Sequence, residues 1–386
     1  MPHIRPDIIV FGSSPWDQPW LTEHNVAHAL RVSANVLFVD PPRSPIMPLR
    51  DGVRLETVRS ALACLRPSLD SRDGISLGRP TALPWPTKRR SQQLSASLLR
   101  VQVDQWVRRL NFVCPTVVTA RPLFRGEAPA ERQALVYLVK DWLQSGADML
   151  GLDPGRLRAD EYRSWSEADH ILATSEALRA RLEQTGFPST VMRHGFDSGV
   201  ATLYESDAPP PPDWACLPRP WLCYAGRVDG RLDFEALRVV ADRWAGGTLI
   251  LLGPISPRLA PSALAALRAR SNVRFFPRVQ REDLPARLKH CDCLLMPYED
   301  SEWLLYGSPL KLWDYLYAGP PIAGSGCTAL VEYPPPLVYF SLRPSGLANA
   351  VASALAAGRS HAHLRRTYAT ENTWEHRAQQ VLAFAG

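Results

Sequence analysis

Five short apolar runs recur between Trp221 and Gly324, and they define the fold class of this chain. In order they are WLCYAG (Trp221–Gly226), TLILLG (Thr248–Gly253), VRFF (Val273–Phe276), CLLMPY (Cys293–Tyr298) and PPIAG (Pro320–Gly324). Each run has the length of a buried strand, and the segments between them have helical character. Strands that alternate with helices predict a parallel α/β sheet.

The first half of the chain has the same rhythm. Its strand-like runs are IIVFG (Ile8–Gly12), NVLFVD (Asn35–Asp40), TVVTA (Thr116–Ala120), LVYLV (Leu135–Val139), HILATS (His170–Ser175) and STVMRHG (Ser189–Gly195). The two halves are separated by ESDAPPPPDWACLPRP, a proline cluster typical of a semi-rigid connector. We therefore predict a Rossmann-like domain over 1–205, a linker over 206–220 and a second Rossmann-like domain over 221–370. A ligand is expected in the crevice between them, at the carboxyl ends of the strands.

Length and composition exclude several classes of protein. The chain has 386 residues, enough for two domains, and 46% hydrophobic with 21% charged residues is typical of a globular protein. It contains no apolar run of about eighteen residues, so no membrane-spanning helix is predicted. The start, MPHIRPDIIVFGSS, leads directly into a strand and has no leader pattern. A cytoplasmic protein is expected.

The seven cysteines do not form a disulfide framework, because they are odd in number and scattered. Cys291 and Cys293 lie beside His290, which could indicate a metal site. However, the alternation of CDCLLMP favours a buried strand, in which cysteine acts as a small hydrophobic residue. We predict no metal site.

Positive charge is concentrated in the first domain. The segment Arg43–Arg132 holds 16 Lys+Arg against 7 Asp+Glu, while the whole chain has a net charge of +6. Such a block can meet phosphates of lipids or nucleotides. No nucleic-acid recognition motif accompanies it, so nucleic acid is disfavoured as a partner. The predicted helix Lys88–Leu110 has an apolar stripe that suits either the core or an anionic membrane surface; its members are Leu99, Val103, Trp106 and Leu110.

The first candidate site is the segment GSPLKLWD (Gly307–Asp314). Ser308 suits a helix N-cap and Pro309 suits the first helical position. The free amides of that first turn and the ammonium of Lys311 would favour a phosphate. Asp314 lies three residues further on the same face, where its carboxylate could accept hydrogen bonds from ribose hydroxyls. The alternative is a capped surface helix with a Lys–Asp pair.

Two strand-to-helix turns are further candidates. In AGRVDGR (Ala225–Arg231), Gly226 allows close approach of the backbone, and Arg227 and Arg231 suit a diphosphate, although a plain turn with solvated arginines has the same pattern. The turn after the first strand begins with Gly12 and Ser13 and lacks the GxGxxG pattern of dinucleotide-binding sites.

Two residues of the first domain are candidates for a general base. Asp141 directly follows the strand LVYLVK, so its carboxylate could take a proton from an acceptor hydroxyl. A helix cap is the alternative role for an aspartate there. His24 lies on the first predicted helix and could line the same crevice or simply pack.

Taken together, these segments resemble the GT-B glycosyltransferases, in particular the family-4-like bacterial enzymes of exopolysaccharide and teichuronic acid biosynthesis. The similarity covers nearly the whole chain and rests on an ordered succession of segments: ADHILATSEALRARL, RHGFD (Arg193–Asp197), YAGRVDGRLDFEAL, LILLGP, NVRFFPRVQREDLPARLKHCDCLLMPY, SPLKLWDYLYAGPPIAG and ENTWEHRAQQVLAF (Glu371–Phe384). The layout is also similar to that of the xanthan glucuronosyltransferase. The last segment looks like the family's closing helix, which crosses back onto the first domain and here would span 371–386.

The resemblance implies a nucleotide-diphospho-sugar donor on the second domain and an acceptor glycan or lipid-linked glycan on the first. By position, Arg227 and Arg231 would hold the diphosphate, and Lys311 with the helix start around Leu310 would hold phosphate. Asp314 would hold the ribose, and Asp141 or His24 would be the base. Gly12 and Ser13 would lie near the donor phosphate.

One departure from the family pattern affects the expected activity. Many relatives carry a Glu-x7-Glu pair, whereas this chain has Tyr306 at the first position and Asp314 at the second. We expect a metal-independent glycosyltransferase without a cofactor, at the inner face of the membrane if its acceptor is lipid-linked. Two alternatives stay open: a catalytically degenerate GT-B scaffold that binds a nucleotide sugar, and a non-hydrolysing nucleotide-sugar epimerase.

Overall fold

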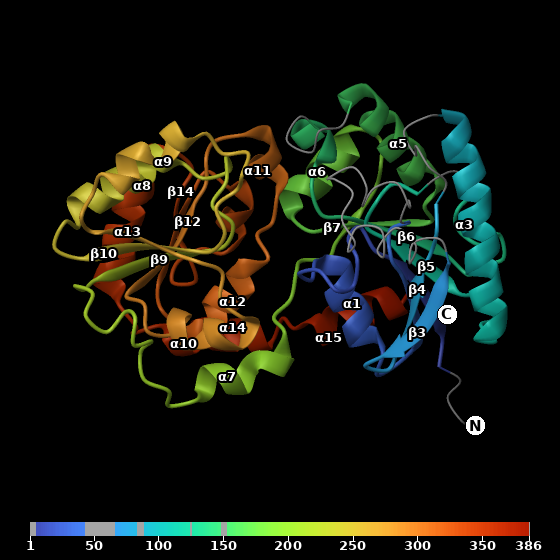
Figure 1. Ribbon diagram of the computed structural model, residues 1–386, viewed down its shortest axis with the longest axis horizontal. Helices are drawn as coiled ribbons and strands as arrows, with labels where there is room; N and C mark the ends of the chain where they lie inside the picture. The colour runs from blue at the N-terminus through green and yellow to red at the C-terminus, as the bar shows by residue number, and fades with distance from the viewer. Residues whose placement is uncertain (1–4, 43–65, 83–88, 124–125, 148–152, 386) are drawn as a thin grey trace, which may run out of the picture. The chain divides into compact units, whose positions relative to one another are not determined.

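The computed structural model describes residues 5–42, 66–82, 89–123, 126–147 and 153–385 (Figure 1). The chain forms two compact units. The first comprises Met1–Ala173, Arg181–Met192 and Glu375–Gly386, and the second comprises Thr174–Ala180 and Arg193–Trp374. The division thus lies upstream of the boundary expected at residue 205, and most of the expected closing helix lies in the first unit.

The first unit is built on a sheet whose described strands run in the order β3-β4-β2-β1-β5-β6-β7-β8. Neighbouring strands are parallel, except that β3 and β4 form an antiparallel hairpin. The strands are β1 (Asp7–Phe11), β2 (Asn35–Val39), β3 (Ser68–Arg72), β4 (Ile75–Arg79), β5 (Thr116–Thr119), β6 (Leu135–Val139), β7 (His170–Ala173) and β8 (Thr190–Val191). The helices are α1 (Thr22–Leu30), α3 (Arg89–Arg109), α5 (Pro154–Glu167), α6 (Glu176–Gln184), which the unit shares with the second, and α15 (Trp374–Leu382).

The second unit has a parallel sheet in the order β11-β10-β9-β12-β13-β14. Its strands are β9 (Trp221–Ala225), β10 (Thr248–Leu252), β11 (Val273–Phe276), β12 (Cys293–Pro297), β13 (Ile322–Ser325) and β14 (Tyr339–Ser341). Its helices are α7 (Ala201–Glu205), α8 (Phe234–Arg243), α9 (Pro261–Arg268), α10 (Leu284–Leu288), α11 (Glu302–Tyr306), α12 (Lys311–Ala318), α13 (Leu347–Ala357) and α14 (Ala362–Thr370). Figure 1 shows α8 and α13 over one face of this sheet and α12 and α14 over the other.

Every residue of the central strands β9, β10 and β12 is buried. Helices on both faces cause this burial, and it explains why these strands are continuous apolar runs instead of alternating patterns. The strands predicted from the sequence are confirmed with ends within two residues, with one exception. Of the predicted strand Ser189–Gly195, only Thr190–Val191 is extended enough to pair, with β7.

The β3–β4 hairpin was not predicted from the sequence. Its two-residue turn is Asp73-Gly74, and both residues have positive φ, 52° and 80°. An Asp-Gly pair is a strong signal for this kind of hairpin turn, because glycine and aspartate tolerate that backbone geometry. The signal was therefore present, but β3 before it is largely exposed and has little apolar pattern, whereas β4 after it is largely buried.

The proline-rich segment before β9 packs onto the second unit. Trp214 is fully buried, and its ring centroid lies 5.8 Å from that of Trp221 and 5.6 Å from that of Phe276. The hydroxyl of Thr248 donates to the carbonyl of Pro218 at 2.8 Å. The composition of 206–220 predicts a semi-rigid connector, and in the structure Trp214 anchors this segment in the core of the second unit.

The apolar stripe of α3 faces the core of the first unit. Leu99, Val103 and Trp106 are buried, and Leu110 packs partly against the same cluster as Val103 and Trp106. The interpretation of this stripe as a membrane-binding face is therefore wrong, since its apolar side chains are already covered by the sheet. Residues 43–65 of the basic block and 83–88 before the helix lie outside the described residues.

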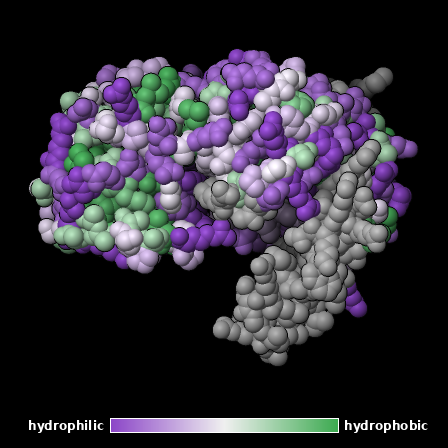
Figure 2. Space-filling model, turned by 90° about the horizontal axis from the view of Figure 1, so that it is seen from above, coloured by the Kyte–Doolittle hydropathy of each residue, from purple (hydrophilic) through white to green (hydrophobic). Residues whose placement is uncertain are grey.

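Figure 2 shows one face of the surface, with the second unit at left, where hydrophobic residues (green) are interspersed with hydrophilic ones (purple). The large exposed apolar side chains that the structure describes in this unit come from separate elements: Val239, Ile255, Val331, Leu342 and Leu364. Scattered side chains of this kind are usual on a globular surface. In the described part of the chain, no helix combines the length and apolar character needed to cross a membrane.

Candidate functional site

The predicted site residues fall into two groups, one in each compact unit. Donor-site candidates lie in the second unit, at the carboxyl ends of β9 and β12 and around the start of α12. The candidates Gly12, Ser13, His24 and Asp141 lie in the first unit, around the carboxyl ends of β1 and β6.

Gly226, directly after β9, is in close contact with Lys311. A Cβ atom at Gly226 would lie 2.3 Å from Nζ of Lys311 and 3.0 Å from the hydroxyl of Tyr224, and its φ of 149° also disfavours a side chain. Gly253, after β10, has a φ of 145°, and a Cβ there would lie 2.1 Å from the carbonyl oxygen of Gly226. Both strand ends therefore need glycine because two backbones and an ammonium group share this space.

The ammonium of Lys311 lies over aromatic rings. Its Nζ is 3.8 Å from the ring centroid of Tyr224 and 5.8 Å from that of Tyr298. These are cation–π contacts, and among the described residues the ammonium has no ion pair. Burial lowers the pKa of Lys311 well below its ordinary value, and the nearby guanidinium of Arg231 lowers it further. An anion at this position would stabilise the charged form.

Arg231 is held beside Lys311 by Asp229. Its Nε and NH2 donate to the two carboxylate oxygens of Asp229 at 2.9 and 2.8 Å, a bidentate pair, and its backbone amide also donates to that carboxylate at 3.1 Å. The pair raises the pKa of Arg231 despite burial of the guanidinium. The structure therefore brings Gly226, Arg231 and Lys311 together. The side chain of Arg227 is exposed, and its carbonyl accepts the hydroxyl of Tyr224 at 2.9 Å.

The start of α12 differs from the prediction. The helix begins at Lys311, and Leu310 is its N-cap residue, in helical backbone geometry and without a side-chain cap. The amides of Leu312 and Trp313 donate to the carbonyls of Pro309 and Leu310, so the first turn is tight. The prediction of Ser308 as the cap is therefore wrong. Phosphate binding here would therefore depend on the ammonium of Lys311 and not on a capped helix end.

Asp314 and Lys311 have different neighbours, although the sequence places them on one helical face. The carboxylate of Asp314 accepts the hydroxyl of Tyr204 at 3.3 Å. Burial raises the pKa of Asp314 to about 6, an effect that Arg281 opposes. On α11, Tyr306 accepts a hydrogen bond at its carbonyl from the hydroxyl of Ser175 at 3.1 Å. Asp314 thus contacts Tyr204 of α7, and Tyr306 contacts Ser175. The sequence did not connect either partner with the site.

In the first unit, the loop after β1 is tied to the end of β6 by a buried charged network. The backbone amide of Ser13 donates to Oε1 of Glu23 at 2.9 Å, and its hydroxyl donates to the same oxygen. The ammonium of Lys140 donates to Oε2 of Glu23 and to the hydroxyl of Ser13, both at 2.8 Å. Burial alone would raise the pKa of Glu23, but Lys140 and the hydrogen bonds lower it to about 2. Glu23 and Lys140 were not predicted.

Gly12 also needs the absence of a side chain, because a Cβ there would lie 2.5 Å from the ring of Phe38. The carbonyl of Gly12 accepts Nε of Arg121 at 3.1 Å. Arg121 in turn forms a two-point ion pair with Glu127. The turn after β1 is therefore fixed from both sides, by Glu23 and by Arg121.

His24 is fully buried on α1, and backbone groups contact both of its ring nitrogens. Its Nδ1 accepts the amide of Leu21 at 3.3 Å, and its Nε2 donates to the carbonyl of Ser14 at 3.2 Å. Burial lowers the pKa of His24, which favours the neutral ring. The ring also packs against Phe38, with a centroid distance of 4.8 Å. In this arrangement His24 holds the turn after β1, and neither nitrogen is available to an acceptor hydroxyl.

Asp141 follows β6 and is half-buried, next to the short 3-10 helix η2 (Leu143–Gly146). The N-cap position of η2 is Trp142, so Asp141 is not the cap that the alternative interpretation required. Glu161 on α5 is buried, and its Oε2 has no hydrogen-bond partner among the described residues. Burial raises the pKa of Glu161 to about 8; Gln144 opposes the rise and Asp141 adds to it.

The raised pKa of Glu161 predicts a specific dependence of stability on pH. The folded state holds this proton up to about pH 8, whereas the unfolded chain releases it near 4.5, so stability falls as pH rises through that interval. We expect Glu161→Gln to stabilise the first unit at pH 9 by about 4–5 kcal/mol and to change little at pH 4. Hydrogen exchange of amides in β6 and α5 measures this, with Glu167→Gln on the same helix as the control. A stabilisation equal at both pH values would contradict the assignment.

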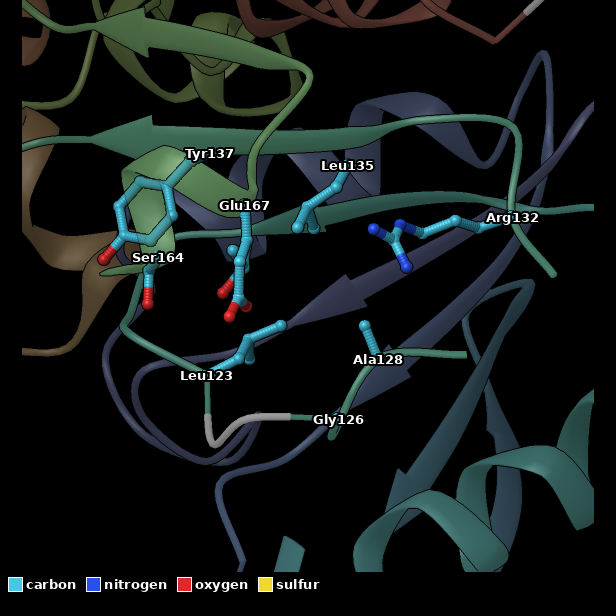
Figure 3. Close-up of a pocket in the computed structure, with 9 residues that line it drawn as sticks. Leu123, Gly126, Ala128, Arg132, Leu135, Tyr137, Ser164 and Glu167 are labelled. Atoms are coloured by element: carbon cyan, nitrogen blue, oxygen red, sulfur yellow. The ribbon is translucent and has the colours of Figure 1, made fainter. Parts of the chain in front are cut away.

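A small cavity near the edge of β6 is not the ligand site. Its volume is about 60 Å³, well below the several hundred Å³ of a typical ligand pocket. In Figure 3 Tyr137, Ser164 and Glu167 lie on one side of this cavity and Arg132 on the other. A nucleotide sugar cannot enter a cavity of this size.

Cys291 and Cys293 are both fully buried, and burial raises the pKa of each thiol. They are small core residues at the start of β12, as the alternating sequence pattern CDCLLMP predicts. Within the described ranges, no three His, Cys, Asp or Glu side chains gather in an arrangement that could hold a metal ion.

Two sheets dominated by parallel strands, each with candidate ligand groups at its carboxyl edge, define this chain as a protein with the GT-B fold. It is similar to the solved structure of sucrose-phosphate synthase from Thermosynechococcus elongatus, with a TM-score of 0.70, 16% identity and coverage of 98% of this chain and 97% of that chain. A UDP-forming trehalose-phosphate synthase from Burkholderia xenovorans gives a TM-score of 0.67 at 13% identity, with 98% of each chain covered. Anabaena HepE, solved in complex with UDP and glucose, gives 0.63 at 14% identity, also with 98% of each covered.

Among curated proteins, the chain is similar to the "Putative teichuronic acid biosynthesis glycosyltransferase TuaH" of Bacillus subtilis. The two are 23% identical over 238 residues, which is 60% of this chain and 60% of the relative. The matched region therefore spans well under two thirds of the relative's length. No known family profile matches the sequence. The resemblance to GT-B glycosyltransferases noted from the sequence is confirmed at the level of the fold.

Proposed function

We propose that this protein is a glycosyltransferase that moves a sugar from a nucleotide-diphosphate donor to an acceptor hydroxyl in bacterial polysaccharide or glycoconjugate biosynthesis. The observation that carries the proposal is the cluster at the carboxyl end of β9. There, Lys311 has no ion pair among the described residues and lies close enough to Arg231 for the guanidinium to lower its pKa. Two neighbouring cations against a glycine backbone suit a diphosphate.

In this proposal the second domain binds the donor. Lys311 and Arg231 contact the diphosphate, and exposed Arg227 adds a third cation from the same turn. Negative charge grows on the diphosphate as the glycosidic bond to it breaks, and preorganised cations stabilise that charge. Leaving-group stabilisation is thus assigned to side chains instead of a metal ion, and no cofactor is needed. Asp314 is assigned to the ribose.

The first domain binds the acceptor, and Asp141 is assigned as the base that removes the proton of the attacking hydroxyl. The alternative base, His24, is less suited because backbone groups contact both of its ring nitrogens. Gly12 and Ser13 are assigned to a loop near the donor phosphate. Glu23 and Arg121 hold this turn fixed.

The donor base and the acceptor class follow from the relatives. HepE was solved with UDP and glucose, and the curated relative is named for teichuronic acid biosynthesis. We therefore propose a UDP-sugar as donor and a glycan or lipid-linked glycan of exopolysaccharide type as acceptor, in the cytoplasm at the inner face of the membrane. The basic segment Arg43–Arg132 would favour such a surface.

The experiment that tests the donor site is a thermal-shift screen with UDP, GDP, TDP and ADP on the wild type and Lys311→Ala. A nucleotide at about 100 times its dissociation constant adds roughly 2.7 kcal/mol to the stability of the unit that binds it. We expect UDP to raise the unfolding temperature of the wild type and to have little effect on Lys311→Ala, because that variant lacks the unpaired ammonium.

Arg274→Ala is the control, because Arg274 is an exposed cation of the second unit on β11 that donates only to the carbonyls of Ser271 and Val273 among the described residues. It should retain the full response to UDP. An equal response in Lys311→Ala and the wild type would contradict the placement of the diphosphate at Lys311.

A further inference from the structure

A second group of cations lines an open, polar pocket of about 530 Å³ in the second unit. The basic side chains around it are Arg219, Lys289, His290, Arg359 and Arg366. Arg219 lies just before β9, and Lys289 and His290 lie just before β12. Because β9 and β12 are parallel, this pocket is at the amino edge of the sheet, whereas Gly226 is at the carboxyl edge. A five-residue strand separates the two edges by about 16 Å.

Among the described residues, three of these cations donate hydrogen bonds only to uncharged oxygens. The guanidinium of Arg359 donates to the carbonyls of Lys289 and Cys291, the latter at 2.9 Å. Arg366 donates to the carbonyl of Tyr317 at 3.1 Å. The ammonium of Lys289 donates to the carbonyl and the hydroxyl of Ser206. Carbonyl partners fix the positions of these side chains but leave their charges uncompensated.

The other charged groups of the pocket leave an excess of positive charge. Arg219 forms an ion pair with Asp292, with its NH1 2.7 Å from each carboxylate oxygen. The two acidic residues on the lining are Glu205, which accepts the hydroxyl of Tyr317 at 2.8 Å, and Asp207. The guanidinium groups of Arg219, Arg359 and Arg366 all line this one pocket and repel one another. Burial lowers the pKa of Arg359, Cys291 and Asp292 oppose the shift, and the two neighbouring guanidinium groups add to it. An anion between them would relieve that repulsion.

We propose that this pocket is a second anion site that binds a phosphate group, separate from the donor diphosphate at Lys311. Guanidinium groups are suited to phosphate because their paired N–H donors match its oxygens. The ligand is either a free phosphate or phosphorylated metabolite, or the headgroup phosphate of an anionic lipid. In each case the group that contacts Arg359, Arg366 and Lys289 is a phosphate.

The test is a titration of inorganic phosphate, followed by calorimetry, on the full chain and on Arg359→Gln/Arg366→Gln. Glutamine keeps an amide donor for the carbonyl partners and removes the charge. We expect the double variant to bind phosphate at least tenfold more weakly and Lys311→Ala to bind it at the new site as the wild type does. Arg274→Gln is the control, since Arg274 is an exposed arginine that also bonds only backbone carbonyls, outside the pocket.

Flotation with phosphatidylcholine vesicles, with and without phosphatidylglycerol, separates the two sources of phosphate. Binding to anionic vesicles that is lost in the double variant assigns the pocket to a lipid headgroup, and phosphate binding without flotation assigns it to a free phosphate. An unchanged unfolding midpoint of the double variant shows that it is folded. The proposal is overturned if neither probe binds the wild type, or if the double variant and Arg274→Gln bind both probes as the wild type does. These outcomes do not depend on whether UDP binds at Lys311.

Discussion

Replacing Asp141 with asparagine is expected to lower the rate of sugar transfer by about 100- to 10,000-fold, the usual contribution of a positioned general base. Asparagine has the same shape as aspartate but cannot accept the proton of the attacking hydroxyl. Donor binding should be unchanged, because the candidate diphosphate contacts lie in the second unit on Gly226, Arg231 and Lys311. The measurement is the initial rate of transfer, with UDP binding followed in parallel by thermal shift.

The control for this substitution is Asp153→Asn. Asp153 is the N-cap residue of α5, where its carboxylate accepts the amide of Arg156 at 2.7 Å, and asparagine caps helices about as well as aspartate. This variant should transfer sugar at the wild-type rate. If Asp141→Asn retains more than about a tenth of the activity, the base is another group and the assignment of Asp141 is wrong.

The second large effect is expected on stability. Replacing Glu23 with glutamine should destabilise the first unit by about 3–5 kcal/mol, because Lys140 is left as an uncompensated charge in a largely buried position. The free energy of opening, measured by hydrogen exchange of the amides in β1 and β6, reports this unit without interference from the second. The low pKa of Glu23, about 2, means that the stabilisation is complete above pH 4.5 and is lost as the pH falls toward 2.

A double substitution distinguishes the lost ion pair from a general disturbance of the turn after β1. Glu23→Gln with Lys140→Met removes both charges and should recover part of the stability that the single variant loses, since no charge is left unpaired. If the double variant is as unstable as Glu23→Gln, or if the single variant loses less than about 1 kcal/mol, the ion pair does not stabilise the turn in the way described.

Much of the fold could be predicted because each central strand is buried on both faces and is therefore a continuous apolar run, as in LVYLV (Leu135–Val139) and TLILL (Thr248–Leu252). The β3–β4 hairpin was not predicted, because the four residues Asp70–Asp73 are exposed and carry no apolar pattern. The packing of Trp214 against Trp221 and Phe276 escaped it too, since a proline-rich composition gives no information about a distant partner.

The candidate site could be predicted where one local turn supplies the chemistry. Gly226 and Arg231 belong to a single strand-to-helix turn, and Lys311 follows a helix-start pattern. The aromatic support of Lys311 by Tyr224 and Tyr298, and the network of Glu23 with Ser13 and Lys140, depend on contacts between segments far apart in the sequence. No local spacing reveals them.

The cap at Ser308 was mispredicted for a related reason. Its sequence pattern, Ser-Pro before a helix, is a good N-terminal signal, yet the tight first turn of α12 begins two residues later. His24 illustrates the same limit, because its burial between Ser14, Leu21 and Phe38 is a property of the tertiary structure.

The most direct test of glycosyltransferase activity is the release of UDP from UDP-sugars by the purified chain, with and without a polysaccharide or lipid-linked glycan acceptor from a bacterial membrane fraction. The proposed function predicts that UDP appears only with acceptor, in step with sugar in the glycan product, and that Lys311→Ala and Asp141→Asn both abolish it. Conversion of the donor to another sugar nucleotide without acceptor would show an epimerase instead. UDP binding with no turnover across the donors and acceptors tried would contradict the account and favour a scaffold.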